Sequence, residues 1–195
     1  MTHIYIGVTF RSLRYLLLLA IPVVLVSCGG SEGGKSFSGA LDSIPYDLGN
    51  PEVFDLDDEL HEISGISPTE DGNALLAIND ERGNLYQLDL TGKILFNKHF
   101  RKGGDYEDLV TAGPSVYVLT SNGNLHLIND WHADSLHSSP YKSSFKDELE
   151  FESLALDPAT RRLLMLVKDG EGRQGKAPVY AFDIRRQEFM PDVVM

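Results

Sequence analysis

The chain has 195 residues, of which 42% are hydrophobic and 24% are charged, a balance typical of a folded globular protein. This composition excludes a disordered tail, a collagen-like repeat and a disulfide-rich scaffold. Lys and Arg number 17 against 29 Asp and Glu, so the net charge is −12. Because so acidic a surface repels phosphate backbones, nucleic acid is not an expected partner, whereas divalent cations and basic partners suit it better.

The first 27 residues predict a secretory signal peptide. Two arginines precede an apolar run over residues 15–26, and the small residue Ser27 follows it. The run is shorter than the roughly 20 apolar residues that a membrane-spanning helix needs, and Pro22 interrupts it. We therefore expect a signal helix that is removed at residue 27 rather than a permanent transmembrane anchor.

Residues 25–28, Leu-Val-Ser-Cys, resemble the bacterial lipobox, in which the chain is cut before the cysteine and the thiol is acylated. Cys28 is the only cysteine, so it cannot form an intramolecular disulfide. We predict a lipoprotein with acyl chains such as palmitate on Cys28, followed by a Gly/Ser-rich tether over residues 28–50. The alternative is an incidental cysteine near an ordinary cleavage site. Gly29 stands where an Asp would retain a lipoprotein in the inner membrane, so the outer membrane of the cell envelope is favoured.

From about residue 53 onward, short apolar runs alternate with turn residues at close spacing, which is typical of an all-β protein. Glycine-containing turns separate the runs at residues 71–73, 91–93, 122–124 and 169–170. The clearest strand-like runs are residues 74–78, 85–90, 94–96, 116–119, 125–128, 163–167 and 179–182.

Three glutamates, Glu62, Glu107 and Glu152, lie 45 residues apart, each beside the start of an apolar strand. A second strand, a polar cluster and a third strand follow each of them, and a fourth run is visible in the first copy at residues 94–100. Four strands in about 45 residues indicate a β-propeller blade, with a β-sandwich as the alternative. We predict a propeller domain over residues 51–195. Its three four-stranded blades are expected at about residues 61–103, 104–147 and 148–190.

Five segments carry a family resemblance: residues 62–66, 79–90, 104–109, 150–154 and 163–168. In this order they resemble the SdiA-regulated family of bacterial envelope β-propellers, which is related to the phytase-like and esterase-like propellers. Members usually have Gly after the motif glutamates, where this chain has Asp108 and Ser153. The resemblance implies an architecture and a location rather than a reaction.

The length predicts an incomplete ring. Three blades fall short of the 4–8 of typical closed propellers, and the family's propeller continues for further blades. We therefore expect a C-terminally truncated chain or a partner that completes the sheet, with self-association through open sheet edges as one form of completion. Residues 52–57 are expected to form the strand that would close the ring.

The glutamates are the first candidates for a binding site. In a propeller the first strand of each blade lines the central channel, so Glu62, Glu107 and Glu152 are expected to converge. Their repulsion would be compensated by a hard cation such as Ca²⁺, with Asp80 and Asp105 as further ligands. The alternatives are glutamates that cap backbone amides or that face a water-filled channel.

Two further residues are candidates for ligand binding. Glu81 lies in a turn between strands, where it would hold a cation or hydrogen-bond the turn amides. Lys168 would bind an anion or neutralise the glutamates, and the second role is favoured. Three histidines are expected in a surface loop around Trp131: His126, His132 and His137.

No catalytic residue is assigned. The sequence contains no phosphate loop, zinc motif, twelve-residue Ca²⁺ loop or nucleophile elbow. The favoured function is a lipid-anchored envelope β-propeller that binds a protein or small-molecule ligand through the face where its blade loops converge, with a cation near the axis. One alternative is a Ca²⁺-dependent phosphoesterase or esterase of phytase-like type, and another is a truncated, inactive gene remnant.

Overall fold

The structure is a computed structural model that describes residues 51–145, 149–168 and 177–191. The predicted signal peptide, Cys28 and the tether lie outside the described residues. The chain divides into two compact units, Met1–Pro51 and Glu52–Met195, and every described strand belongs to the second. Within the described part, no helix is both long enough and apolar enough to cross a bilayer.

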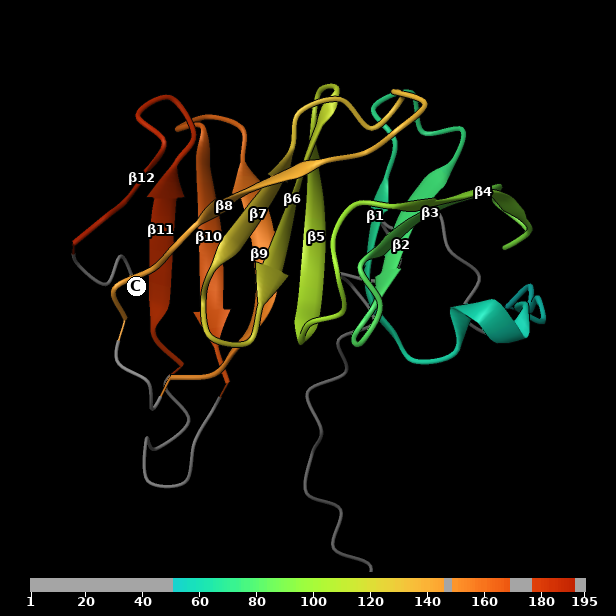
Figure 1. Ribbon diagram of the computed structural model, residues 1–195, viewed down its shortest axis with the longest axis horizontal. Helices are drawn as coiled ribbons and strands as arrows, with labels where there is room; N and C mark the ends of the chain where they lie inside the picture. Colours follow the sequence, from blue (N-terminus) through green and yellow to red (C-terminus); the bar gives the residue numbers. More distant parts are fainter. Residues whose placement is uncertain (1–50, 146–148, 169–176, 192–195) are drawn as a thin grey trace, which may run out of the picture. The chain divides into compact units, whose positions relative to one another are not determined.

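Twelve strands form three antiparallel sheets of four strands each (Figure 1). The first sheet contains β1 (Ile63–Pro68), β2 (Leu75–Asn79), β3 (Asn84–Leu88) and β4 (Ile94–His99). The second contains β5 (Tyr106–Ala112), β6 (Ser115–Thr120), β7 (Leu125–Ile128) and β8 (Ser138–Tyr141). The third contains β9 (Phe151–Asp157), β10 (Arg162–Val167), β11 (Val179–Asp183) and β12 (Glu188–Phe189).

The arrangement of the sheets is that of propeller blades. Within each sheet the strands follow chain order, so β1, β5 and β9 each form one edge. These three strands are also neighbours, since β5 contacts both β1 and β9. They are therefore the inner strands of three successive blades, and the predicted all-β propeller with three four-stranded blades is confirmed.

Local sequence explains the hairpins. The predicted turns at residues 71–73, 91–93 and 122–124 each place their glycine at positive φ, which residues with a Cβ rarely adopt. The fourth predicted turn, at residues 169–170, lies outside the described residues.

The core consists of apolar layers between adjacent sheets, and β6 contributes to two of them. Val116 and Val118 pack in the layer shared with the first sheet, whereas Tyr117 and Leu119 pack in the layer shared with the third. Alternate side chains of a strand point to opposite faces. Both faces of β6 are therefore buried, which accounts for its continuous apolar run.

The face of the first sheet that points away from the second sheet is covered by a short helix. The 3₁₀ helix η1 (Asp58–Leu60) places Leu60 in a cluster with Ala77, Tyr86 and Leu88. Residues 52–57, predicted to form a closing strand, form no strand, and Val53 is 80% exposed. That prediction was wrong because residues 52–57 are exposed throughout and pair with no described strand.

Backbone hydrogen bonds join neighbouring blades at the start of the inner strands. The Tyr106 amide donates to the Asp80 carbonyl at 2.8 Å, and the Phe151 amide donates to the Ser121 carbonyl at 2.8 Å. Each bond links the first residue of an inner strand to the residue that follows the second strand of the preceding blade. The edge where the inner strands begin is therefore fixed across the three blades.

Candidate functional site

Each inner strand carries a β-bulge near its first residue. The pairing register shifts at Ser64 in β1, at Glu107 in β5 and at Glu152 in β9. A bulge leaves one extra residue unpaired and bends the strand. Ser64, Glu107 and Glu152 are therefore structurally equivalent.

Glu62 belongs to a different set of equivalent positions. Its carbonyl accepts a hydrogen bond from the Asp80 amide at 3.3 Å. In the next blades the carbonyls of Asp105 and Glu150 accept the same bond, from Ser121 and Lys168. The expectation that Glu62, Glu107 and Glu152 occupy equivalent positions is therefore wrong, because the inner strand of the first blade begins one residue after Glu62.

Four carboxylates meet at this edge between the second and third blades. They line a pocket of about 240 Å³ together with Ser121 and Lys168. The carboxylates belong to Asp105, Glu107, Glu150 and Glu152. We call this the acidic pocket.

Lys168 is the counter-ion of the acidic pocket. Its Nζ lies 2.7 Å from Oε1 of Glu152 and 3.7 Å from Oε2 of Glu150. The hydrogen bond with Glu152 and the charges of both glutamates raise the pKa of Lys168. The lysine therefore compensates part of the negative charge of these two glutamates. The carboxylate of Asp105 accepts a hydrogen bond from the Ser121 hydroxyl.

The surroundings of Glu107 in the acidic pocket disfavour its charged form. Its pKa is raised, mainly because the side chain is partly buried, and further by the negative charges of Asp105 and Glu152. Lys168 opposes this rise, and Asp80 adds a smaller repulsion. The site thus holds more negative charge than its lysine compensates.

The other predicted site residues lie outside the acidic pocket. Glu62 is exposed, with a carboxylate 3.8 Å from Nδ1 of His61. Asp80 and Glu81 accept hydrogen bonds through their backbone carbonyls, from Tyr106 at 2.8 Å and from Gly104 at 3.2 Å. Among the residues that the structure describes, no group of three or more His, Cys, Asp or Glu has the geometry of a metal site.

Asp108 is a residue whose role the sequence did not reveal. Its carboxylate accepts hydrogen bonds from the amide of Leu109 at 2.8 Å and from the amide of Leu154, in the next blade, at 2.7 Å. At the equivalent position of the first blade, a Cβ on Gly65 would lie 2.8 Å from Cα of Asp108. The sequence carried one signal of this role, because Asp108 stands where the family motif usually has Gly.

The three histidines do not form a surface loop together. His126 lies in β7 and is 6% exposed. Burial and the nearby Arg101 lower its pKa to about 4. His132 is exposed and stacks on the buried Trp131 with ring centroids 3.7 Å apart. The prediction was thus wrong for His126, because a strand that is buried on both faces includes it.

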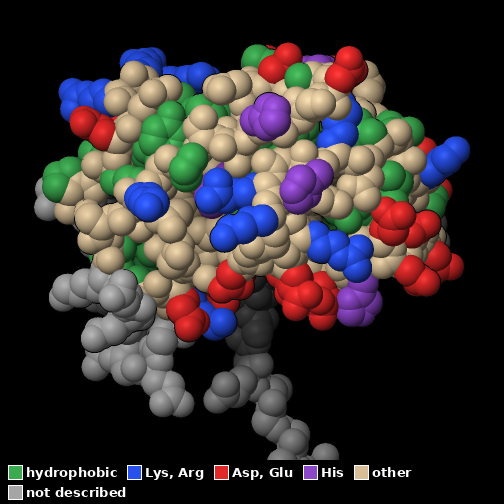
Figure 2. Space-filling model, in the orientation of Figure 1, with side chains coloured by type: hydrophobic (Ala, Val, Ile, Leu, Met, Phe, Trp, Pro, Cys, Tyr) green, Lys and Arg blue, Asp and Glu red, His purple; other side chains and the backbone are tan. Residues whose placement is uncertain are grey.

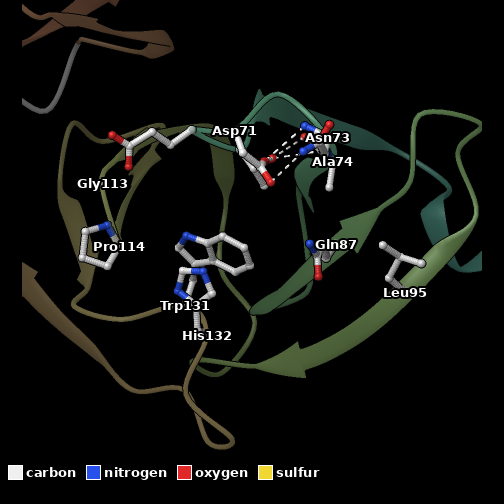
Figure 3. A pocket seen from close by; sticks show the side chains of 11 residues that line it. Asp71, Asn73, Ala74, Gln87, Leu95, Gly113, Pro114, Trp131 and His132 are labelled. Carbon is white, nitrogen blue, oxygen red and sulfur yellow. Dashed lines mark hydrogen bonds between the residues drawn. The ribbon is translucent and has the colours of Figure 1, made fainter.

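A larger pocket, of about 690 Å³, lies beside Trp131 (Figure 3). Glu70 and Asp71 are its acidic lining residues. The Asp71 carboxylate accepts hydrogen bonds from the Thr69 hydroxyl at 2.6 Å and from the backbone amide of Asn73 at 3.1 Å. These bonds lower the pKa of Asp71. The carboxylate thus stabilises the turn between β1 and β2 through these hydrogen bonds.

Comparison with known proteins adds a fold likeness at low identity. Hydrazine synthase from Kuenenia stuttgartiensis is 16% identical, with a TM-score of 0.52, and the match covers 68% of this chain and 37% of that one. The β-propeller domain of Cps50 (Swd1) from Myceliophteria thermophila is 15% identical over 65% of this chain and 40% of its own, with a TM-score of 0.47. The computationally designed Ika4 protein is 16% identical over 74% and 80%, also with a TM-score of 0.47.

The chain spans well under half the length of the hydrazine synthase chain that it matches. No curated protein matches the sequence at a significant level. The family model described as SdiA-regulated matches residues 46–171, which is more than half of the chain and includes both inner strands that border the acidic pocket. The protein, a β-propeller, therefore belongs to the SdiA-regulated family.

Proposed function

We propose that the protein is a lipid-anchored module of the bacterial envelope that binds a positively charged ligand or protein segment at the acidic pocket. The observation that supports this function is the meeting of four carboxylates around one lysine at the edge where β5 and β9 begin. This edge belongs to the inner strands, where a propeller presents its loops to a partner.

The chemistry of the pocket suits a cation that competes with Lys168. An ammonium, a guanidinium or Ca²⁺ that bound Glu152 and Glu150 would free the lysine to turn towards solvent, because its side chain is half exposed. An added positive charge would stabilise the charged form of Glu107, whose pKa is raised by partial burial and by its acidic neighbours. Ca²⁺ takes six to eight oxygen ligands without strict geometry, so it is one occupant of this class.

The test is a calorimetric titration of the full chain with Ca²⁺ and, separately, with a short oligoarginine peptide. We expect Glu107→Gln to weaken binding of the cation that binds, at least about tenfold. Glu188→Gln, which removes an exposed carboxylate far along the chain on β12, should leave binding unchanged. If neither cation binds the unaltered chain, the proposed function is wrong. Ca²⁺-dependent release of nitrophenol from a phosphate ester would instead favour the hydrolase alternative.

The membrane anchor has its own test. Cys28→Ser removes the predicted acylation site, so we expect the protein to move from the membrane fraction to the soluble fraction of a bacterial lysate. Ser31→Ala, a change in the predicted tether that spares the cysteine, is the matched control and should stay in the membrane fraction. Retention of the Cys28→Ser chain in the membrane fraction would contradict lipid anchoring through this residue.

A further inference from the structure

A small hollow beside β7 and β8 is lined mainly by hydrogen-bond donors. It has a volume of about 200 Å³, and Arg101, Lys102 and Lys142 line it. Within the described residues, these three cations form no ion pair. In a chain with a net charge of −12, three cations around one hollow make a local site of opposite sign. We call this the basic hollow.

Two asparagine side chains add neutral donors to the basic hollow. Oδ1 of Asn122 accepts a hydrogen bond from the Thr120 hydroxyl at 2.8 Å, and Oδ1 of Asn124 accepts one from the Ser143 amide at 2.9 Å. Because both carbonyl oxygens are occupied, the NH₂ groups are the parts of these amides left to contact a ligand. The one carboxylate in the lining, Asp105, already accepts a hydrogen bond from Ser121.

A buried histidine also lines the basic hollow. His126 is 6% exposed, and its Nδ1 has no hydrogen-bond partner among the described residues. Buried polar atoms are nearly always paired, so an unpaired one beside a hollow indicates a missing partner. A neutral imidazole can donate or accept a hydrogen bond, as a hydroxyl or ester oxygen of a ligand requires. Tyr106, whose ring centroid lies 6.0 Å from that of His126, fixes the imidazole from one side.

A second, wider hollow of about 600 Å³ shares Arg101 with the basic hollow. Lys98, His99 and His137 line this second hollow, together with the carboxylate of Asp134. Figure 2 shows Lys, Arg and His side chains in the middle of this face of the molecule, above Asp and Glu side chains that gather along its lower edge. A ligand with its anionic group in the basic hollow would therefore have further basic side chains nearby, on the other side of Arg101.

The backbone holds Arg101 at the junction of the two hollows. The Arg101 amide donates to the Gly83 carbonyl at 3.2 Å. A Cβ on Gly83 would lie 1.7 Å from the Arg101 carbonyl oxygen, so only glycine permits this approach. The backbone position of Arg101 is thus set by a contact between Gly83, just before β3, and the segment that leads into β5.

We propose that the basic hollow binds a phosphate group, carried by a small molecule or by a lipid headgroup. Arg101, Lys102 and Lys142 would supply charge-assisted hydrogen bonds to the phosphate oxygens, and Asn122 and Asn124 would supply neutral ones. The volume fits a phosphate group rather than a whole ligand, since sites for drug-sized molecules start at about 300 Å³.

The first experiment titrates the full chain with inorganic phosphate while amide and imidazole resonances are followed by NMR. We expect saturable shifts at His126 and at the Asn122 and Asn124 side chains. Arg101→Gln should weaken phosphate binding at least about tenfold. Lys93→Gln removes the same charge from an exposed site beside the distant residues 55–57 and should leave binding unchanged.

The second experiment identifies the source of the phosphate. Vesicles of phosphatidylcholine alone are compared with vesicles that also contain phosphatidylglycerol, so that any contribution of an acyl anchor cancels. Extra binding to the anionic vesicles that Arg101→Gln abolishes would indicate a lipid headgroup, whereas phosphate binding without that difference would indicate a soluble ligand. The proposal is overturned if no shifts appear up to about 10 mM phosphate, or if Arg101→Gln and Lys93→Gln weaken binding equally.

A further variant covers the case in which Arg101→Gln perturbs the fold. His126→Tyr places in β7 the residue that the register puts at the same position in the other two blades, Tyr86 and Tyr180. It should fold, fill the hollow and abolish phosphate binding, and retained binding would contradict the proposal. Glu107→Gln separates this site from the proposed function. Asp105 lines both sites, but Glu107 lines only the acidic pocket, so the change should weaken cation binding without weakening phosphate binding.

Discussion

At the scale of single residues, His126 links the stability of the protein to pH. Its pKa is about 4 in the folded chain against an ordinary value of 6.5, because burial and Arg101 disfavour its charged form. Between pH 4 and pH 6.5, His126 binds a proton in the unfolded chain but not in the folded chain. The stabilising contribution is therefore complete above pH 6.5 and is lost as the pH falls towards 4.

We expect the free energy of unfolding to fall by up to about 3 kcal/mol through this group between pH 6.5 and 4. His126→Tyr should remove this part of the pH dependence, as measured by urea denaturation at several pH values. His137→Gln, which replaces an exposed histidine, is the control and should follow the unaltered chain. Equal pH dependence in the His126→Tyr chain would show that the imidazole is not the group responsible.

The residues of the candidate site were partly predictable. Glu107, Glu152, Asp105 and Lys168 were identified from the sequence because each adjoins an apolar strand, and the structure brings them into one pocket. The error at Glu62 arose from counting along the chain, since a spacing of 45 residues does not reveal that the bulge of the first blade falls at Ser64. Bulges change register without leaving a pattern in hydrophobicity.

At the scale of strands, Asp108 joins two inner strands that share no sheet. Asp108→Ala would leave the amides of Leu109 and Leu154 without their acceptor in a partly buried place. We expect a loss of about 2 kcal/mol in the free energy of unfolding, measured by chemical denaturation. Asp108→Asn retains one acceptor oxygen and should lose less.

Ser153→Ala is the matched control for Asp108, because Ser153 occupies the same position beside the bulge of β9 and is exposed. It should change the unfolding free energy by less than about 0.5 kcal/mol. A similar loss in the Asp108 and Ser153 variants would mean that the position beside the bulge, rather than the shared carboxylate, determines stability.

The predictability of strands follows their burial. β6 and β10 were found from the sequence because their residues are apolar in succession; both faces of β6 are buried, whereas β10 alternates between buried and more exposed residues. β8 (Ser138–Tyr141) and β12 (Glu188–Phe189) were not predicted, because outer strands are short and partly solvated and carry no apolar run. The outer strand of the first blade, β4, could be recognised in the sequence because half-buried and exposed residues alternate along it.

At the scale of the whole molecule, net charge describes the protein poorly. A charge of −12 predicts an affinity for cations, and the acidic pocket agrees with it. The basic hollow could not be predicted from that sum, because Arg101 and Lys142 are far apart in sequence and line one hollow only in the folded chain. A sum of charges contains no information on where they lie in space.

The backbone hydrogen bonds between blades have a consequence for cooperative unfolding. A stack of blades in which each contacts only its neighbours can open at one interface while its hairpins persist. The Tyr106 amide reports the interface of the first two blades, and the Phe151 amide reports the next. In native-state hydrogen exchange, Asp108→Ala should therefore speed exchange of the Phe151 amide far more than that of the Tyr106 amide. The two amides would then measure the stability of the two blade interfaces separately.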